Sequence, residues 1–345
     1  MFHTLKSDNK KFQSFDEAIN HINQREYDST SFAAKDTEIE HDGFIIQGKK
    51  FPIYDVFIDS LFGNTKLPRK NESVLPTENV ISDLNTLLKK MGDDQFDLKM
   101  LNGAAYSMTK FGSKGARSPL THKQFLDILQ TNTDIKDVKS ISLTPKFLRV
   151  STYNDQMTQE VLEGDFHHFG IDYSNGEIYR SNILTAGLML YRISCSNSAV
   201  APFDDKYVRL RPTTNPKELQ QHFAEVCTSL NIDYDMIKER IERVAGIKMN
   251  ASLLKFIAGG LGFAPLEIKE KLFNSYFEQD DEGNVTKSIK PNVLENISIY
   301  DVFNDITRAA HHNTGVDETT RYRMETFAGS LLDEKNKKVR EILAV

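Results

Sequence analysis

The middle of the chain holds a run of side chains that can do acid–base or metal chemistry, DFHHFGIDYSNGEIYRSN. If residues 166–173 form a strand, alternation puts His168 and Asp172 on one face and mostly apolar side chains on the other. An imidazole and a carboxylate in this register can hydrogen-bond or share a metal ion, and Glu177, after the Asn-Gly turn, adds a second carboxylate. These three residues are therefore candidate catalytic groups, with a divalent metal as cofactor if the protein is an enzyme. A hairpin with solvated polar side chains fits the same run.

A second polar run follows at residues 191–202, with the sequence YRISCSNSAVAP. Cys195 can act as a nucleophile only with a nearby base and a lowered thiol pKa. The run contains no base at a spacing that would indicate a catalytic pair with this cysteine. A buried cysteine at a strand end commonly serves as a small apolar side chain. The Ser-Asn-Ser segment after it is typical of a turn, with a binding role left open.

Two segments are basic. In KYVRLR, alternation sets a tyrosine ring and two guanidinium groups on one face against apolar side chains on the other, as in binders of single-stranded nucleic acid. In TKFGSKGARS, three cations accompany two glycines, so the backbone can approach a phosphate closely; a surface loop explains this segment as well. We predict nucleic-acid contacts from these side chains: Lys110, Lys114, Arg117, Arg192, Tyr207, Arg209 and Arg211.

A further polar set lies in NDITRAAHH, residues 304–312. On a helix, Asn304, Thr307 and His311 form a stripe beside apolar positions. No acid or second histidine follows at a metal-binding spacing, so the stripe alone is weak evidence for a metal site. His311 can instead complement the carbonyl groups at the end of this helix.

These residues need elements to position them. Residues rich in β-branched and aromatic side chains predict strands over 140–152, 166–173, 183–195 and 207–211, with two shorter strands within 43–56. Helical periodicity predicts helices over 14–24, 77–91, 217–230, 234–245, 266–277, 299–312 and 318–343. A polar loop is expected over 61–77.

This order of elements predicts an α+β protein. A central, mostly antiparallel sheet comes from the middle third, flanked by helices from the N-terminal and C-terminal thirds. We expect an N-terminal α+β region over residues 1–100 and a core over residues 101–345. Within that core, the sheet falls in 140–212 and a helical region in 215–345.

Composition limits the class of protein. The chain has 345 residues, of which 39% are hydrophobic and 27% charged, which excludes a wholly disordered chain. No apolar run is long enough to cross a bilayer, and we see no secretory signal. With only two cysteines we expect a reduced, cytoplasmic protein. Because the net charge is −6, contact with nucleic acid requires a local basic patch.

The run GIDYSNGEIYRSNILTAGLMLYRISCSNSAVAP, the basic KYVRLR, and the later SIYDVFNDITRAAHH and RYRMETFAGSLL resemble the phage/plasmid-like proteins of domain-of-unknown-function family 932. The matching polar positions are Asn175, Glu177, Arg192, Cys195, Asn197, Asn304, Thr307 and His311. Gly176, Ser198 and Asp305 depart from the family pattern. The resemblance implies replication, recombination or counter-defence on foreign DNA, in the host cytoplasm if the chain is phage-encoded.

Two hypotheses follow. The first is an oligomeric protein that binds or anneals single-stranded DNA during recombination or replication, without a cofactor. The second is an enzyme acting on nucleic acid or nucleotides through His168, Asp172, Glu177 and His311. A counter-defence protein that binds a host factor also fits the resemblance, but this hypothesis identifies no residue that would make the contact.

Overall fold

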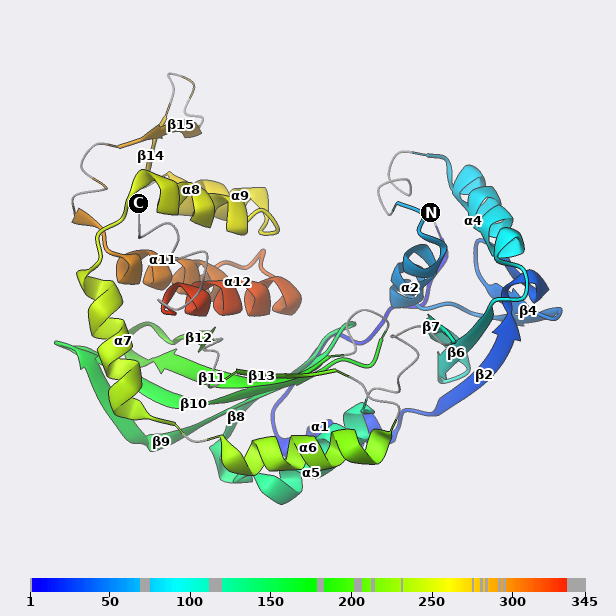
Figure 1. The fold of residues 1–345 in the computed structure, drawn as a ribbon, viewed down its shortest axis with the longest axis horizontal. Helices are drawn as coiled ribbons and strands as arrows, with labels where there is room; N and C mark the ends of the chain where they lie inside the picture. The colour runs from blue at the N-terminus through cyan, green and yellow to red at the C-terminus, as the bar shows by residue number, and fades with distance from the viewer. Residues whose placement is uncertain are drawn as a thin grey trace.

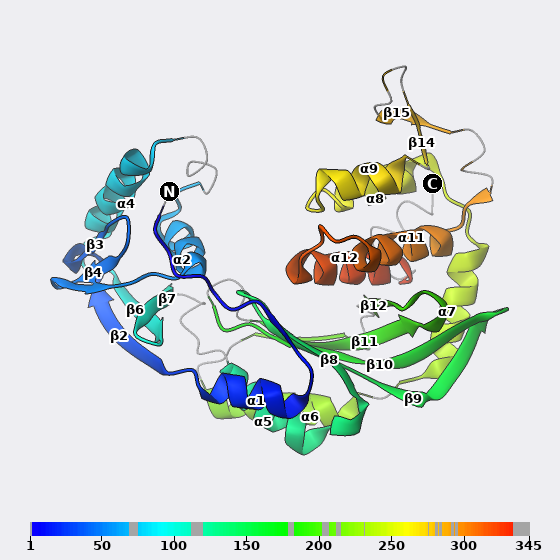
Figure 2. The ribbon, with the colours of Figure 1, turned by 180° about the vertical axis from the view of Figure 1, so that it is seen from behind.

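A broad sheet forms the floor of the molecule, and two groups of elements rise at its opposite ends on the same side (Figure 1). The fold comes from a computed structural model that describes residues 2–68, 75–111, 120–178, 183–201, 207–211, 215–230, 232–274, 276–279, 282, 285–290, 293 and 296–333. Seen from behind, a layer of helices covers the underside of the same sheet (Figure 2).

The central sheet has seven strands in the order β1-β8-β9-β10-β11-β12, with β13 also paired to β11. Their bounds are β1 (Lys10–Phe12), β8 (Val138–Leu143), β9 (Leu148–Leu162), β10 (Asp165–Asn175), β11 (Leu184–Arg192), β12 (Asn197–Ala201) and β13 (Tyr207–Leu210). All of these pairings are antiparallel. The α+β class with a central sheet from the middle of the chain is therefore confirmed.

Helices α1 (Phe15–Asn23), α5 (His122–Asn132) and α6 (Pro216–Ser229) cover the underside of the sheet (Figure 2). The rings of Tyr173 on β10 and Phe223 on α6 meet edge to face at 6.1 Å in the core between them. Since side chains alternate along a strand, the neighbours of Tyr173 point to the opposite, upper face.

Four C-terminal helices stand above the sheet (Figure 1): α8 (Ala251–Gly260), α9 (Leu266–Phe273), α11 (Ile299–His312) and α12 (Glu318–Leu331). Helix α7 (Tyr234–Gly246) rises along one end of the sheet, and its first residue, Tyr234, meets Phe169 of β10 at 5.5 Å. Helix α12 lies very close to β12, because a Cβ on Gly329 would stand only 2.1 Å from the carbonyl oxygen of Val200. Only glycine permits this approach, which brings the side chains of α12 onto the sheet.

Residues 27–111 form what we call the N-terminal module, at the other end of the sheet (Figure 1). One three-stranded sheet contains β2 (Tyr27–Ala33), β6 (Gln95–Leu101) and β7 (Ala104–Lys110), and a second contains β3 (Thr37–Ile39), β4 (Phe44–Ile46) and β5 (Lys49–Phe51). Helices α2 (Asp55–Thr65) and α4 (Thr77–Met91) pack with them around buried phenylalanines. The expected boundary after residue 100 falls inside β6, one residue before its end, while β1 and α1 belong to the layers of the central sheet.

Short elements complete the described chain. They are the 3₁₀ turns η1 (Ala34–Asp36), η2 (Ile135–Asp137) and η3 (Ile193–Cys195), and the hairpin strands β14 (Phe277–Gln279) and β15 (Val285–Ile289). Among the described helices, none has the length and apolar character needed to cross a membrane.

Several local predictions are confirmed. Ser14 caps α1 by accepting from the backbone N–H of Glu17, helix α4 ends before Gly92, and α11 has the predicted bounds. The polar loop expected over 61–77 is wrong at its start, because the apolar side chains of α2 bury against the module core and continue that helix to Thr65. The last helix, predicted over 318–343, is wrong in its end, because α12 stops at Leu331 and the backbone N–H of its C-cap Leu332 donates to the Gly329 and Ser330 carbonyls.

Candidate functional site

A cavity of about 310 Å³ lies on the upper face of the central sheet, below the end of α11 and the first half of α12. Side chains from β1, β8, β9, β11 and β12 line it, so it crosses the sheet from one edge strand to the other. Its charged lining consists of four cations, Lys11, Lys139, Arg149 and Arg321, and two carboxylates, Glu318 and Glu325. This volume is at the lower end of the range for small-molecule sites, roughly 300–1,000 Å³.

A buried ion cluster forms the base of the cavity. Arg149 donates from Nε to Oδ1 of Asp172 at 2.6 Å, and its Nη2 lies 2.6 Å from Oε2 of Glu325 on α12. The Ser151 hydroxyl donates to the same Asp172 oxygen at 2.6 Å. These contacts tie α12 to the sheet, and only 1% of Asp172 is exposed.

The Arg149 guanidinium pairs with two carboxylates, Asp172 and Glu325, and the pKa values of these two acids shift in opposite directions. Burial raises the pKa of Asp172, although Arg149 acts in the opposite direction. Burial also opposes ionisation of Glu325, but Arg149 and His311 outweigh it and lower its pKa to about 2. Glu325 is therefore a fixed negative charge next to His311.

His311, from the predicted polar stripe, reaches the cavity beside Ser198. Its Nε2 lies 2.6 Å from Glu325 Oε1 and 3.1 Å from the Ser198 hydroxyl, and that hydroxyl donates to the same Glu325 oxygen at 2.9 Å. The same Nε2 also accepts from the Ser198 backbone N–H at 3.2 Å, so His311 joins Ser198 on β12 to Glu325 on α12.

Three stacked rings, which we call the aromatic platform, lie beside the cavity. Tyr153 stacks on Tyr191 with ring centroids 4.8 Å apart and on His168 at 5.1 Å. His168 and Tyr191 are direct partners in the β10–β11 register. All three are partly exposed, and the Lys139 ammonium lies 5.3 Å from the Tyr153 ring. The predicted site residue His168 therefore belongs to an aromatic and cationic surface.

The same surface continues along the strands. Phe166 lies two positions before His168 on β10, so alternation puts it on the platform's face. Its exposed fraction, 43%, is high for a large apolar side chain. Gly170, next along β10, leaves room for β9, since a Cβ there would stand 1.6 Å from the Thr152 carbonyl oxygen.

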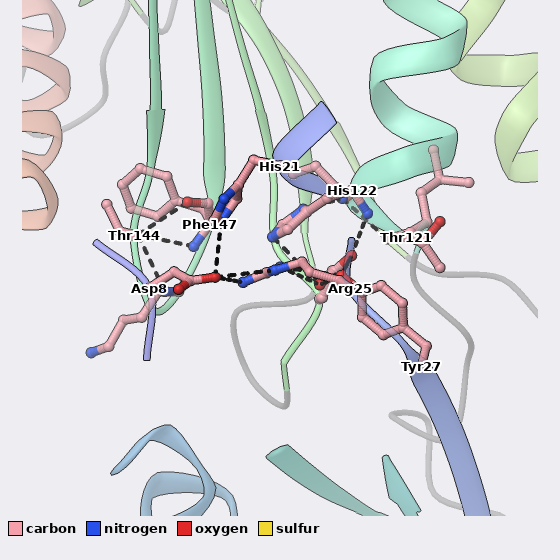
Figure 3. A network of polar contacts seen from close by, with 12 residues as sticks. Asp8, His21, Arg25, Tyr27, Thr121, His122, Thr144 and Phe147 are labelled. Atoms are coloured by element: carbon pink, nitrogen blue, oxygen red, sulfur yellow. Dashed lines mark hydrogen bonds and ion pairs between the residues drawn. The ribbon is translucent and has the colours of Figure 1, made fainter. Parts of the chain in front are cut away.

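Glu177 lies in a different cluster, beside Arg25, Tyr27 and His122, which Figure 3 shows where α1 and the N-terminal module meet the central sheet. It accepts hydrogen bonds from the Tyr27 hydroxyl at 2.9 Å and from the backbone N–H of His122, and Arg25 stands 3.7 Å away. Arg25 also donates to Asp8 at 2.9 Å. Burial raises the pKa of Glu177 and lowers that of His122 well below its usual value. The cluster joins four segments that are distant in sequence.

Asn175 completes this second cluster. Its amide donates to the Leu120 carbonyl at 3.0 Å and lies 3.1 Å from Nδ1 of His122. Of the three candidate catalytic residues, His168 and Asp172 thus lie around the cavity, while Glu177 lies with Asn175 at the module junction.

Other residues that carry the resemblance to family 932 lie at the turn between β11 and β12. Arg192 donates to Asp165 at 2.7 Å, and its Nη1 lies 3.7 Å from the Cys195 sulfur. The Tyr300 hydroxyl on α11 donates to the other Asp165 oxygen at 2.7 Å. Burial opposes ionisation of Asp165, but hydrogen bonds from His167, Arg192 and Tyr300 outweigh it and lower its pKa. Arg192 is therefore held in an ion pair that joins the sheet to α11.

The end of α11 contacts this turn directly. His312 Nε2 lies 2.8 Å from both Asn197 Oδ1 and the Cys195 carbonyl oxygen. On the same helix, the Thr307 hydroxyl donates to the Asn304 carbonyl at 3.0 Å. The structure therefore brings together the two segments around residues 192–198 and 304–312, which are more than a hundred positions apart.

The predicted basic residues do not form one group. Lys110 pairs with Asp94 at 2.5 Å in the N-terminal module, and Lys114 and Arg117 lie outside the described residues. Tyr207 and Arg209 share a face of β13, as alternation predicted, and Arg209 and Arg211 are exposed.

A metal site was predicted for the case of an enzyme. Among the residues that the structure describes, no three His, Cys, Asp or Glu side chains gather as metal ligands. A divalent cofactor stays a prediction.

Arg149, Tyr153 and Glu325 were not predicted as site residues from the sequence. Arg149 precedes buried Val150 on the strand predicted over 140–152, and Tyr153 comes directly after that strand, so the period-two pattern, continued by one residue, was a usable signal. Glu325 lies in a highly charged helix segment, where nothing distinguishes a buried carboxylate from a solvated one.

Comparison with protein-family models, with curated proteins and with solved structures finds no match for this chain. The resemblance to family 932 stays a prediction that these comparisons neither support nor refute.

Proposed function

We propose that this chain binds single-stranded DNA on the upper face of the central sheet. The observation that carries the proposal is the partly exposed aromatic platform of Tyr153, His168 and Tyr191, with cations beside it. Proteins that bind single strands combine rings on which bases stack with cationic side chains that follow the phosphates. Bases stack on the platform and on Phe166, and Lys139 contacts the backbone.

The distribution of charge supports this assignment in spite of the net charge of −6. Cations and carboxylates balance at the cavity once Asp172 and Asp155, the partners of Arg149 and Lys139, are counted with its lining, so an anion meets less repulsion there than from the protein as a whole. Binding is favoured over hydrolysis because the Ser198 hydroxyl donates to Glu325 at 2.9 Å and not to the imidazole beside it, so this geometry does not activate it as a nucleophile.

Fluorescence anisotropy with a labelled oligothymidylate across a salt series tests the proposal. Tyr153→Ala should weaken binding by about tenfold, since stacking one base is worth about 1–3 kcal/mol. Tyr153→Phe, which keeps a ring, should bind like the parent. Phe111→Ala removes an aromatic that is 48% exposed in the N-terminal module and should leave affinity unchanged.

A second pair of variants tests the ionic contact with the DNA backbone. Lys139 pairs with Asp155, and Lys35 pairs in the same way with Asp93 in the N-terminal module, at 2.6 Å. Lys139→Ala should lower the slope of log affinity against log salt by about 0.7, the value for one contact with a single-strand phosphate, and Lys35→Ala should not. Affinity that is independent of salt, or equal in Tyr153→Ala and the parent, would refute the proposal.

A further inference from the structure

One wall of the cavity holds a carboxylate between two cations. Glu318, the first residue of α12, places its Oε1 2.7 Å from the Lys11 ammonium on β1, and Nη1 of Arg321 contacts the same oxygen. Only 13% of the Glu318 side chain and 16% of the Arg321 side chain are exposed, while Lys11 is 63% exposed. An ammonium and a guanidinium converging on one anionic oxygen is the arrangement that binds a phosphate oxygen.

We propose that the Lys11–Arg321 pair is a phosphate subsite of the DNA-binding surface, and that Glu318 occupies it as an internal competitor that a backbone phosphate displaces. This inference rests on the proposed function, because it assigns one phosphate contact within the same surface. The ligand class is a phosphodiester or another phosphate group.

The subsite does not depend on Glu318 for its geometry. Arg321 donates from Nε to the Ala310 carbonyl at 3.2 Å and from Nη2 to the Val316 carbonyl at 3.5 Å, so the turn between α11 and α12 fixes its guanidinium. Lys11 is held by the pairing of β1 with β8, opposite Ser142. The Arg321 guanidinium therefore stays in place when the carboxylate moves away, and Lys11 keeps its position on β1, from which its ammonium reaches the same space.

The Glu318 side chain can leave without disturbing its helix. The start of α12 is capped by Asp317, which accepts from the Thr320 backbone N–H at 2.8 Å. Two ion pairs hold the Glu318 carboxylate, and a bound phosphate replaces both of them. In the free protein the Glu318 carboxylate offsets part of the positive charge of Lys11 and Arg321. A phosphate therefore binds the parent protein more weakly than it would bind the two cations without that carboxylate.

Neutralising the competitor should therefore strengthen binding. Glu318→Gln should lower the Kd for a labelled oligothymidylate by about threefold to tenfold, and the slope of log affinity against log salt should steepen by about 0.7, the value for one additional phosphate. Glu267→Gln is the matched control, because Glu267 forms an exposed 2.8 Å pair with Lys271 on α9 and its loss changes the net charge equally. That control should change the Kd less than twofold.

A double variant separates the subsite from a general charge effect. Lys11→Met in the Glu318→Gln background should abolish the increase in affinity. If Glu318→Gln binds no more tightly than Glu267→Gln, or if the increase survives the loss of Lys11, the inference is overturned while the proposed function stands.

Failure of the proposed function has a different signature. If the parent and all variants bind no oligonucleotide, single-strand binding is refuted, and calorimetric titration with inorganic pyrophosphate then judges the subsite alone. Binding by Glu318→Gln that Lys11→Met removes supports the subsite, and no binding by Glu318→Gln overturns it.

Discussion

Replacing Gly329 by alanine should destabilise the protein, although the same change stabilises most helices. Gly329 lies near the end of α12, where a Cβ would stand 2.1 Å from the Val200 carbonyl oxygen and 2.6 Å from the Val200 carbonyl carbon. Those atoms are backbone of the sheet and cannot rotate aside, so α12 must move by about 1 Å. Overpacking of this kind costs about 3 kcal/mol, and the improvement in helix propensity offsets about 1 kcal/mol, which leaves a loss of about 2 kcal/mol.

Gly259 provides the matched control. It lies in α8, it is exposed, and a Cβ there would meet no atom within 4 Å. Gly259→Ala should therefore stabilise the protein by up to about 1 kcal/mol. Urea unfolding followed by circular dichroism measures both variants. If Gly329→Ala is as stable as the parent, the close packing of α12 on β12 is wrong, and with it the position of Glu325 and Arg321 above the cavity.

Three further predictions concern buried charges and thiols. Arg149→Met should cost about 3–5 kcal/mol in urea unfolding, because it leaves Asp172 and Glu325 buried without their cation; a loss below about 1 kcal/mol would contradict the ion cluster. The folded-state pKa of Glu325, about 2, lies below its usual 4.5, so its stabilising effect is present above about pH 4.5 and is lost as the pH falls toward 2. Thermal unfolding should therefore show a smaller loss between about pH 5 and about pH 3 in Glu325→Gln than in the parent, and equal losses would count against this ion pair. Burial raises the pKa of Cys227 to about 12, so a disulfide reagent such as DTNB should label only partly exposed Cys195 in the folded protein and both thiols after denaturation; rapid labelling of folded Cys195→Ser would disprove the burial of Cys227.

Helix α12 links these observations. Its last turn packs on β12 through Gly329, its middle presents Glu325 to Arg149, and its first turn supplies Glu318 and Arg321 to the cavity. A change that shifts the helix should therefore alter stability and the proposed DNA binding together.

The sequence by itself determined the local elements. Ser14 and Glu17 begin α1, Gly92 follows α4, and apolar periodicity sets the bounds of α11, because capping and amphipathic spacing act within one or two turns. Alternation also placed Tyr207 and Arg209 on one face of β13, since the side-chain period of a strand is two.

Only the tertiary structure decided which polar residues meet. Glu177 is nine positions from His168 in sequence, yet the β10 strand rises about 3.3 Å per residue and carries them into separate clusters. Arg149 and Glu325 are far apart in the chain, and they meet because α12 folds back onto the sheet. Such pairings depend on how whole elements pack, and no short-range pattern in the sequence encodes them.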